Sequence, residues 1–163
     1  MGLAEKIDER ELEAYHIFLA AFLAGLNEMG MLNQASVNMA ARRAGKYLAE
    51  YARTRNDLPA PEFSTADTAR SLLSFLDRIL GLGTKLEIQA EGESTECRVL
   101  SSGCRFCPKG VGEAELEGTL CPYPGLIEEF INQLLPENNE MHLVMINRRP
   151  LIKEGDSCLI RLS

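Results

Sequence analysis

Residues 81–100 read Gly-Leu-Gly-Thr-Lys-Leu-Glu-Ile-Gln-Ala-Glu-Gly-Glu-Ser-Thr-Glu-Cys-Arg-Val-Leu, and the spacing of apolar residues changes within this stretch. Before it, apolar residues recur every three or four positions, which is the period of an α-helix. From Leu86 onward they alternate with polar residues, which is the period of a half-buried β-strand. Glu91 to Ser94 indicate a turn into a second strand around Cys97 to Leu100. The sequence therefore predicts helices first and strands after them.

Three helices are predicted upstream of this stretch. Apolar residues at helical spacing indicate a first helix over Asp8 to Asn33 and a second over Val37 to Tyr51. Small residues in the second helix, Gly45 among them, permit close packing against another helix. The third helix begins after Ser64, because a serine hydroxyl is a favourable N-cap. Two prolines within Thr54 to Phe63 indicate an extended connection before it.

Downstream of residue 100, the sequence predicts a Cys-rich loop, one helix and two strands. The loop covers Ser101 to Thr119, and the helix covers Gly125 to Leu135. Met141 to Ile146 and Cys158 to Leu162 are the predicted strands, joined by a turn. Because strands follow helices and do not alternate with them, we expect an α+β fold. It should place an N-terminal helical layer on a mostly antiparallel sheet of about four strands.

The length and composition are those of one domain. The chain has 163 residues, and 45% of them are hydrophobic, which is ample for a single buried core. We expect one domain over residues 1–163. Within it, an N-terminal helical pair covers residues 8–53, and a ligand-binding core covers residues 64–163.

The charge and apolar patterns argue against two classes of partner. The formal net charge is -7, and no run of Lys and Arg offers a basic stripe for nucleic acid. No stretch reaches the roughly 18 consecutive apolar residues of a membrane span, and the N-terminal residues lack the order of a signal peptide. We therefore expect a cytoplasmic protein that binds neither nucleic acid nor membrane.

Five cysteines, four of them between Cys97 and Cys121, indicate a metal site. An odd number of clustered cysteines in a reducing compartment disfavours a disulfide framework. Cys104 and Cys107 form a CxxC pair, which can turn two thiolates toward one tetrahedral ion. Cys121 and Cys158 can complete the set. We expect zinc, although four thiolates also suit an iron–sulfur cluster.

Two other interpretations of the cysteines stay open. Free cysteines are commonly buried as small apolar side chains. A CxxC pair can also be a redox dithiol, although Pro108-Lys109-Gly110 is typical of a loop and not of the helix N-terminus that lowers a thiol pKa. Cys97 lies on a predicted strand, so we do not expect it to bind the metal ion. Cys107→Ser should then lose the metal, and Cys97→Ser should lose neither metal nor stability.

Two motifs carry a family resemblance: Cys121-Pro122-Tyr123-Pro124-Gly125-Leu126 and Glu154-Gly155-Asp156-Ser157-Cys158-Leu159-Ile160. On these motifs, residues 86–163 resemble the 4-vinyl reductase domain family, small-molecule or hydrocarbon-binding modules related to the transport-particle and haem-nitric-oxide-binding folds. The resemblance implies that Cys121 and Cys158 hold zinc. The family's hairpin ligand positions fall near Asn147 and Pro150, which cannot bind zinc, whereas Cys104 and Cys107 could take their place.

The resemblance implies a module that binds or senses a small apolar or aromatic molecule. One alternative is an enzyme subunit in tetrapyrrole vinyl reduction, which would need a partner for hydride chemistry because no nicotinamide or flavin phosphate loop is present. Another is a homodimeric scaffold like the transport-particle subunits. A binding module is favoured over an enzyme, and no catalytic residue is assigned.

The aromatic and methionine residues suggest where a ligand and a second subunit would bind. A pocket is expected under the helix that follows Cys121, unless its aromatic residues simply fill the core. Its expected lining is Phe22, Tyr47, Phe106, Tyr123 and Phe130. A homodimer is expected through the first two helices, because they carry more apolar surface than one sheet face can cover. The flanking apolar residues are Phe18, Phe22, Met29 and Met31.

Overall fold

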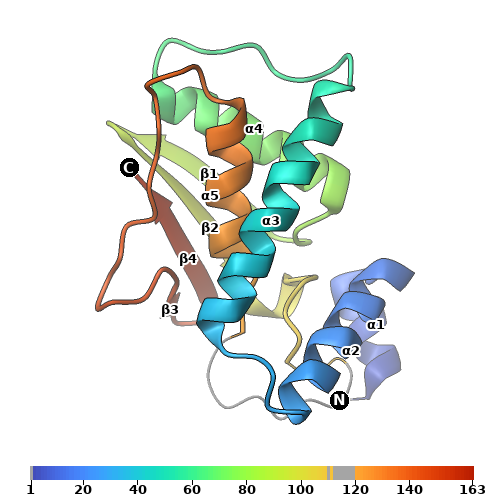
Figure 1. The fold of residues 1–163 in the computed structure, drawn as a ribbon. Helices are drawn as coiled ribbons and strands as arrows, with labels where there is room; N and C mark the ends of the chain where they lie inside the picture. The colour runs from blue at the N-terminus through green and yellow to red at the C-terminus, as the bar shows by residue number, and fades with distance from the viewer. Residues whose placement is uncertain (1, 110, 112–119) are drawn as a thin grey trace.

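An antiparallel sheet with helices on one face organises the molecule (Figure 1). The computed structural model describes residues 2–109, 111 and 120–163, and its class is α+β, as the sequence predicts. In the described residues the sheet has four strands in the order β1-β2-β4-β3. Their bounds are β1 Leu86–Glu91, β2 Ser94–Leu100, β3 Ile152–Glu154 and β4 Ser157–Leu162.

The predicted hairpin of β1 and β2 is confirmed. The strands pair antiparallel with Ile88 opposite Cys97, and Gly92 takes the positive φ of 59° that their tight turn requires. Along β2, buried residues alternate with partly buried ones, so one face of the strand points to the core. Cys97 belongs to this buried face.

The third predicted helix is also confirmed as α4 (Thr65–Leu80). The Ser64 hydroxyl accepts a hydrogen bond of 3.0 Å from the Asp67 N–H, which caps the helix start. Gly81 ends the helix with a φ of 57°. The apolar face of α4 packs on β1 and β2, so this helix covers the sheet half that comes first in the sequence.

Two helices cross closely in front of the sheet (Figure 1). They are α3 (Gln34–Arg53) and α5 (Tyr123–Leu134), and they make the most extensive helix-to-helix contact of the described residues. A Cβ on Gly45 would lie 2.6 Å from the Leu126 carbonyl oxygen, and one on Gly125 would lie 2.5 Å from the Asn38 carbonyl oxygen. The expectation that Gly45 permits close helix packing is therefore confirmed.

The prediction of one helix over Asp8 to Asn33 was wrong. The chain forms α1 (Leu3–Arg10) and α2 (Ala14–Glu28), with Glu11 in the left-handed region at a φ of 50°. Where the sequence predicts a helical pair at residues 8–53, three helices, α1 to α3, cover residues 3–53. His16 explains the restart, because its Nδ1 accepts a hydrogen bond of 3.0 Å from the Glu13 N–H. No Gly or Pro marks this break in the sequence.

The same histidine attaches α2 to the rest of the molecule. His16 Nε2 lies 3.2 Å from the carbonyl oxygens of both Leu80 and Gly81 at the end of α4. Two carbonyl acceptors at Nε2 and an N–H donor at Nδ1 fit only the neutral tautomer with its proton on Nε2. Burial lowers the pKa of His16 and favours the same neutral form.

The C-terminal strands differ in part from the prediction. Residues 157–162 form β4, close to the predicted strand, but its hairpin partner β3 lies at Ile152–Glu154 and not at Met141 to Ile146. The latter segment is extended and contributes an isolated bridge from Leu143 to Leu162. Glu128 of α5 holds it, because its buried carboxylate accepts a hydrogen bond of 3.0 Å from the Leu143 N–H. The segment's position thus depends on a tertiary contact that alternation does not reveal.

None of the described helices combines the length and the apolar character that crossing a membrane requires.

Candidate functional site

Four cysteines line one small cavity at the edge of the core. Its volume is about 50 Å³, and we refer to it as the thiol cavity. Its lining is Val99, Ser101, Cys104, Cys107, Pro108, Lys109, Leu120, Cys121, Tyr123, Leu151 and Cys158. The four cysteines in this wall are the four that the sequence proposes as metal ligands.

Cys104 and Cys107 follow a short 3-10 helix, η1 (Ser101–Gly103), which turns the chain at the end of β2. Their position is fixed from α1, because the buried Arg10 donates to the Cys107 carbonyl oxygen at 3.2 Å. In return, Arg105 Nε donates to the Arg10 carbonyl oxygen at 2.9 Å. The CxxC pair is therefore tied to α1 on both sides of its backbone.

Cys121 lies just before α5, and Gln34 at the start of α3 fixes its backbone. The Gln34 amide donates to the Cys121 carbonyl oxygen at 3.0 Å, and its own oxygen accepts from the Cys121 N–H at 3.1 Å. Cys158 comes from β4, where it lies opposite Val99 of β2. The thiols thus reach the cavity from three separate parts of the chain.

The surroundings of two of the four thiols, Cys104 and Cys121, favour their protonated form. Burial, and after it the charge of the neighbouring Cys107 thiol, raise the pKa of Cys104 to about 11. Burial also raises the pKa of Cys121 well above its usual value, and the Cys104, Cys107 and Cys158 thiols add to the effect. Cys104 and Cys121 therefore lie close enough to the other cavity thiols for a charge there to act on them.

The thiols are not arranged around a common centre. Across residues 2–109, 111 and 120–163, no three His, Cys, Asp or Glu side chains form a group that could hold an ion. Two of the sulfur atoms have other partners: Cys104 Sγ lies 3.6 Å from the Tyr123 hydroxyl oxygen, and Cys158 Sγ lies 3.9 Å from the Ser101 hydroxyl oxygen. Four thiols are a donor set that suits a thiophilic divalent ion such as zinc. To bind it, Cys104 and Cys158 would have to give up their contacts with the Tyr123 and Ser101 hydroxyl groups.

The five aromatic residues expected to line a ligand pocket do not come together. Phe22 and Tyr47 lie on the surface, each with 54% of its area exposed. Phe130 is buried in the main core, and Phe106 packs against Tyr123 with ring centroids 5.5 Å apart. Only Tyr123 lines the thiol cavity, and pockets for small organic molecules usually measure about 300–1,000 Å³. The cavity therefore has room for an ion or a few water molecules and not for an aromatic ring.

Cys97 is not among the residues that line the thiol cavity. It is 1% exposed among the residues of the main core, and burial raises its pKa. Part of the predicted Cys-rich loop, residues 110 and 112–119, lies outside the described residues. Sequence reasoning did not identify Arg10 and Gln34, because each acts on a cysteine segment more than 80 positions away.

Comparisons with known proteins agree on one family. A family model described as the MJ0207 family matches residues 30–163, which include all four cysteines of the thiol cavity. The uncharacterized protein MJ0207 of Methanocaldococcus jannaschii is 31% identical over 129 residues, or 79% of this chain and 74% of the relative. The uncharacterized protein MJ1342 of the same organism is 34% identical over 59 residues, or 36% of this chain and 51% of that relative.

Proposed function

Because this chain belongs to the MJ0207 family, whose model covers all four cavity cysteines, we ask what those cysteines do, and we propose that the chain is a metal-binding module whose thiol cavity holds one structural zinc ion. The observation that carries the proposal is the convergence of four cysteines on one cavity from three separate parts of the chain. Zinc in structural sites is bound by four such ligands, so no open position remains for water. The ion would therefore act on stability and not on a substrate.

The electrostatics of the cavity support this role. Burial raises the pKa of Cys104 and Cys121, and the charges of the neighbouring cysteine thiols in the cavity raise it as well. A divalent cation among the thiolates replaces their repulsion with attraction, and metal binding then releases the thiol protons. The ion would join the segment after η1, the start of α5 and β4, which are held around the cavity by Arg10, Gln34 and the β2–β4 pairing.

The size of the cavity favours a single ion over an iron–sulfur cluster. The volume of about 50 Å³ is more than one water molecule needs, so a single ion would fit. An iron–sulfur cluster needs more room, because it places several iron and sulfide atoms between the thiolates. The family resemblance adds support, because it implies zinc binding by Cys121 and Cys158. The resemblance also implies an apolar or aromatic ligand. The aromatic residues do not support that expectation in the same way, because they do not line one pocket.

Native mass spectrometry of the full chain, purified under reducing conditions, tests the zinc proposal. We expect one zinc ion per chain, lost on denaturation, with all five cysteines then free to react with a thiol reagent. Protein incubated with equimolar zinc that still shows a metal-free mass would contradict the proposal. So would visible absorption from an iron–sulfur cluster, or a mass lower by two hydrogens from a disulfide.

We also propose that two copies of the chain associate through α2. All four flanking residues named from the sequence are exposed, from Phe22 at 54% to Phe18 at 70%. The rings of Phe18 and Phe22 stack on the surface with centroids 5.9 Å apart. Glu28 is the only Asp, Glu, Lys or Arg in α2, and helices that are apolar on all sides are normally buried. A second copy would cover this face by an isologous contact.

Phe18→Asp combined with Phe22→Asp should convert a dimeric mass into a monomeric one, because each carboxylate would be buried unpaired at the contact. Sedimentation equilibrium at micromolar concentration measures the change. Phe63→Asp is the matched control, since Phe63 is fully exposed on the connection between α3 and α4. A monomeric wild-type protein at every concentration would contradict the dimer.

A further inference from the structure

A second hollow opens beside the thiol cavity, and positive side chains line it. Its volume is about 380 Å³. Its lining contains Arg148, Arg149 and Lys153, together with Gln34, Cys121, Pro150 and Leu151, and no Asp or Glu. We refer to it as the basic hollow. Cys121 and Leu151 line both spaces, so the two are neighbours.

The positive charge of the basic hollow is not neutralised by the described part of the chain. The net charge of the protein is -7, yet none of the three cations forms an ion pair with a described residue. Glu154, adjacent to Lys153, is paired with Arg98 at 3.0 Å. Successive strand residues point to opposite faces, so this carboxylate is directed away from the Lys153 side of β3.

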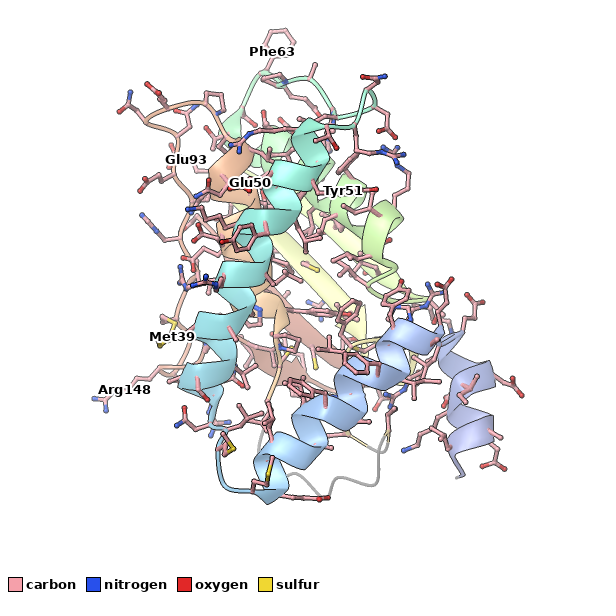
Figure 2. The ribbon with its side chains drawn as sticks, turned by 45° about the vertical axis from the view of Figure 1, so that its right-hand side comes forward. Met39, Glu50, Tyr51, Phe63, Glu93 and Arg148 are labelled. Carbon is pink, nitrogen blue, oxygen red and sulfur yellow. The ribbon has the colours of Figure 1, made fainter. Side chains whose placement is uncertain are left out.

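A strained turn presents the two arginines. Ile146 and Arg149 exchange two backbone hydrogen bonds of 3.0 Å, and the residues between them, Asn147 and Arg148, have φ values of 52° and 62°. Two positive φ angles define the tight turn in which glycine is preferred at the second position. An arginine there carries a conformational cost, and such costs persist mostly at functional positions. Figure 2 shows Arg148 reaching outward from the body of the molecule at this turn.

We propose that the basic hollow binds the phosphate group of a small molecule. Three cations without an ion-pair partner among the described residues suit a multiply charged oxyanion better than a single carboxylate, and arginine forms bidentate contacts with phosphate oxygens. The hollow is larger than a phosphate ion alone and falls within the usual range for small-molecule sites. The floor is firm, because the two hydrogen bonds between Gln34 and Cys121 hold α3 against the chain before α5.

This site stands independently of zinc, although the two would share a wall. Bound phosphate would lie beside Cys121, whose backbone N–H donates a hydrogen bond to Gln34. Phosphate and metal would therefore both act on the backbone of Cys121. A competing role for the three cations is to balance the negative charge of a zinc tetrathiolate without binding any ligand. That role predicts no phosphate binding by the wild type, and weaker zinc binding when the cations are removed.

Titration of the full chain with inorganic phosphate, followed by isothermal calorimetry at low salt, tests the proposal. The test variant is Arg149→Gln with Lys153→Gln, and the matched control is Arg43→Gln with Lys46→Gln on the exposed side of α3. Both variants change the net charge by the same amount. We expect the test variant to bind phosphate roughly tenfold or more weakly, and the control to bind as the wild type does. Binding should also weaken as sodium chloride is added.

Three further arms identify the source of the phosphate and the outcomes that overturn the proposal. A soluble phosphate monoester should compete with inorganic phosphate, whereas vesicles of anionic lipid should not bind unless the group belongs to a lipid headgroup. Absence of phosphate binding by the wild type, equal weakening in both variants, or loss of zinc alone in the test variant would each overturn it. Cys107→Ser should keep phosphate binding, which separates this site from the zinc proposal.

Discussion

Cys107→Ser is expected to abolish zinc binding and to lower the unfolding temperature by roughly 10 °C. A ligand present at a thousand times its Kd stabilises a protein by about 4 kcal/mol, and each kcal/mol corresponds to about 2–4 °C for a chain of this size. Cys107 is partly exposed, so its replacement removes a thiolate without opening a large hole in the core. Thermal unfolding of zinc-loaded protein, with and without a strong chelator, measures the difference.

Cys97→Ala is the matched control for this prediction. The structure changes the control that the sequence suggested, because Cys97 is fully buried and Cys97→Ser would place an unpartnered hydroxyl in the core. Cys97→Ala should retain one zinc ion per chain and should still lose stability on chelation. If the chelator lowers the stability of wild-type and Cys107→Ser proteins equally, the cavity is not the zinc site.

Gly45→Ala combined with Gly125→Ala should destabilise the protein by about 3 kcal/mol, or roughly 6–12 °C. Each added Cβ would come closer than 3.0 Å to a backbone oxygen of the facing helix, and backbone cannot rotate away as a side chain can. The helices would have to separate along their crossing. Overpacking of this kind costs about 1–3 kcal/mol per site, which exceeds the gain in helix propensity of about 1 kcal/mol.

Gly25→Ala provides the control for the helix crossing. Gly25 also lies inside a helix, α2, but an added Cβ would meet nothing within 4 Å. Helix propensity alone then acts, so this variant should gain up to about 1 kcal/mol. Thermal unfolding of all variants gives the comparison. A double variant as stable as the wild type would show that α3 and α5 are less tightly packed than this structure describes.

Local chemistry explains which parts of the fold were predictable. The β1–β2 hairpin and the cap at Ser64 depend on residues within a few positions of one another, so their signals are present in the sequence. The break between α1 and α2 depends on the His16 side chain and on carbonyls at the end of α4, which lie more than 60 positions away. Helical periodicity continues through Leu12 without any sign of that contact.

The candidate site shows the same division. The residue type identified the four cysteines, because clustered thiols in one chain have few structural uses. Their spacing could not show that the sulfur atoms of Cys104 and Cys158 lie against the hydroxyl groups of Tyr123 and Ser101. The aromatic pocket failed for a related reason. Phe22 and Tyr47 lie on the outward sides of their helices. In α2, apolar residues occur on all sides, so their spacing does not separate the outward Phe22 from the inward positions.

The strand order β1-β2-β4-β3 leaves β1 at one margin of the sheet, with a row of backbone groups that could pair with another chain. Lys85, Glu87 and Glu91 are exposed along that margin, where burial of their charges would oppose the addition of a foreign strand. The opposite margin is β3, whose three residues are too few to template a long ladder. Both margins of the sheet therefore disfavour fibre-like growth by strand addition.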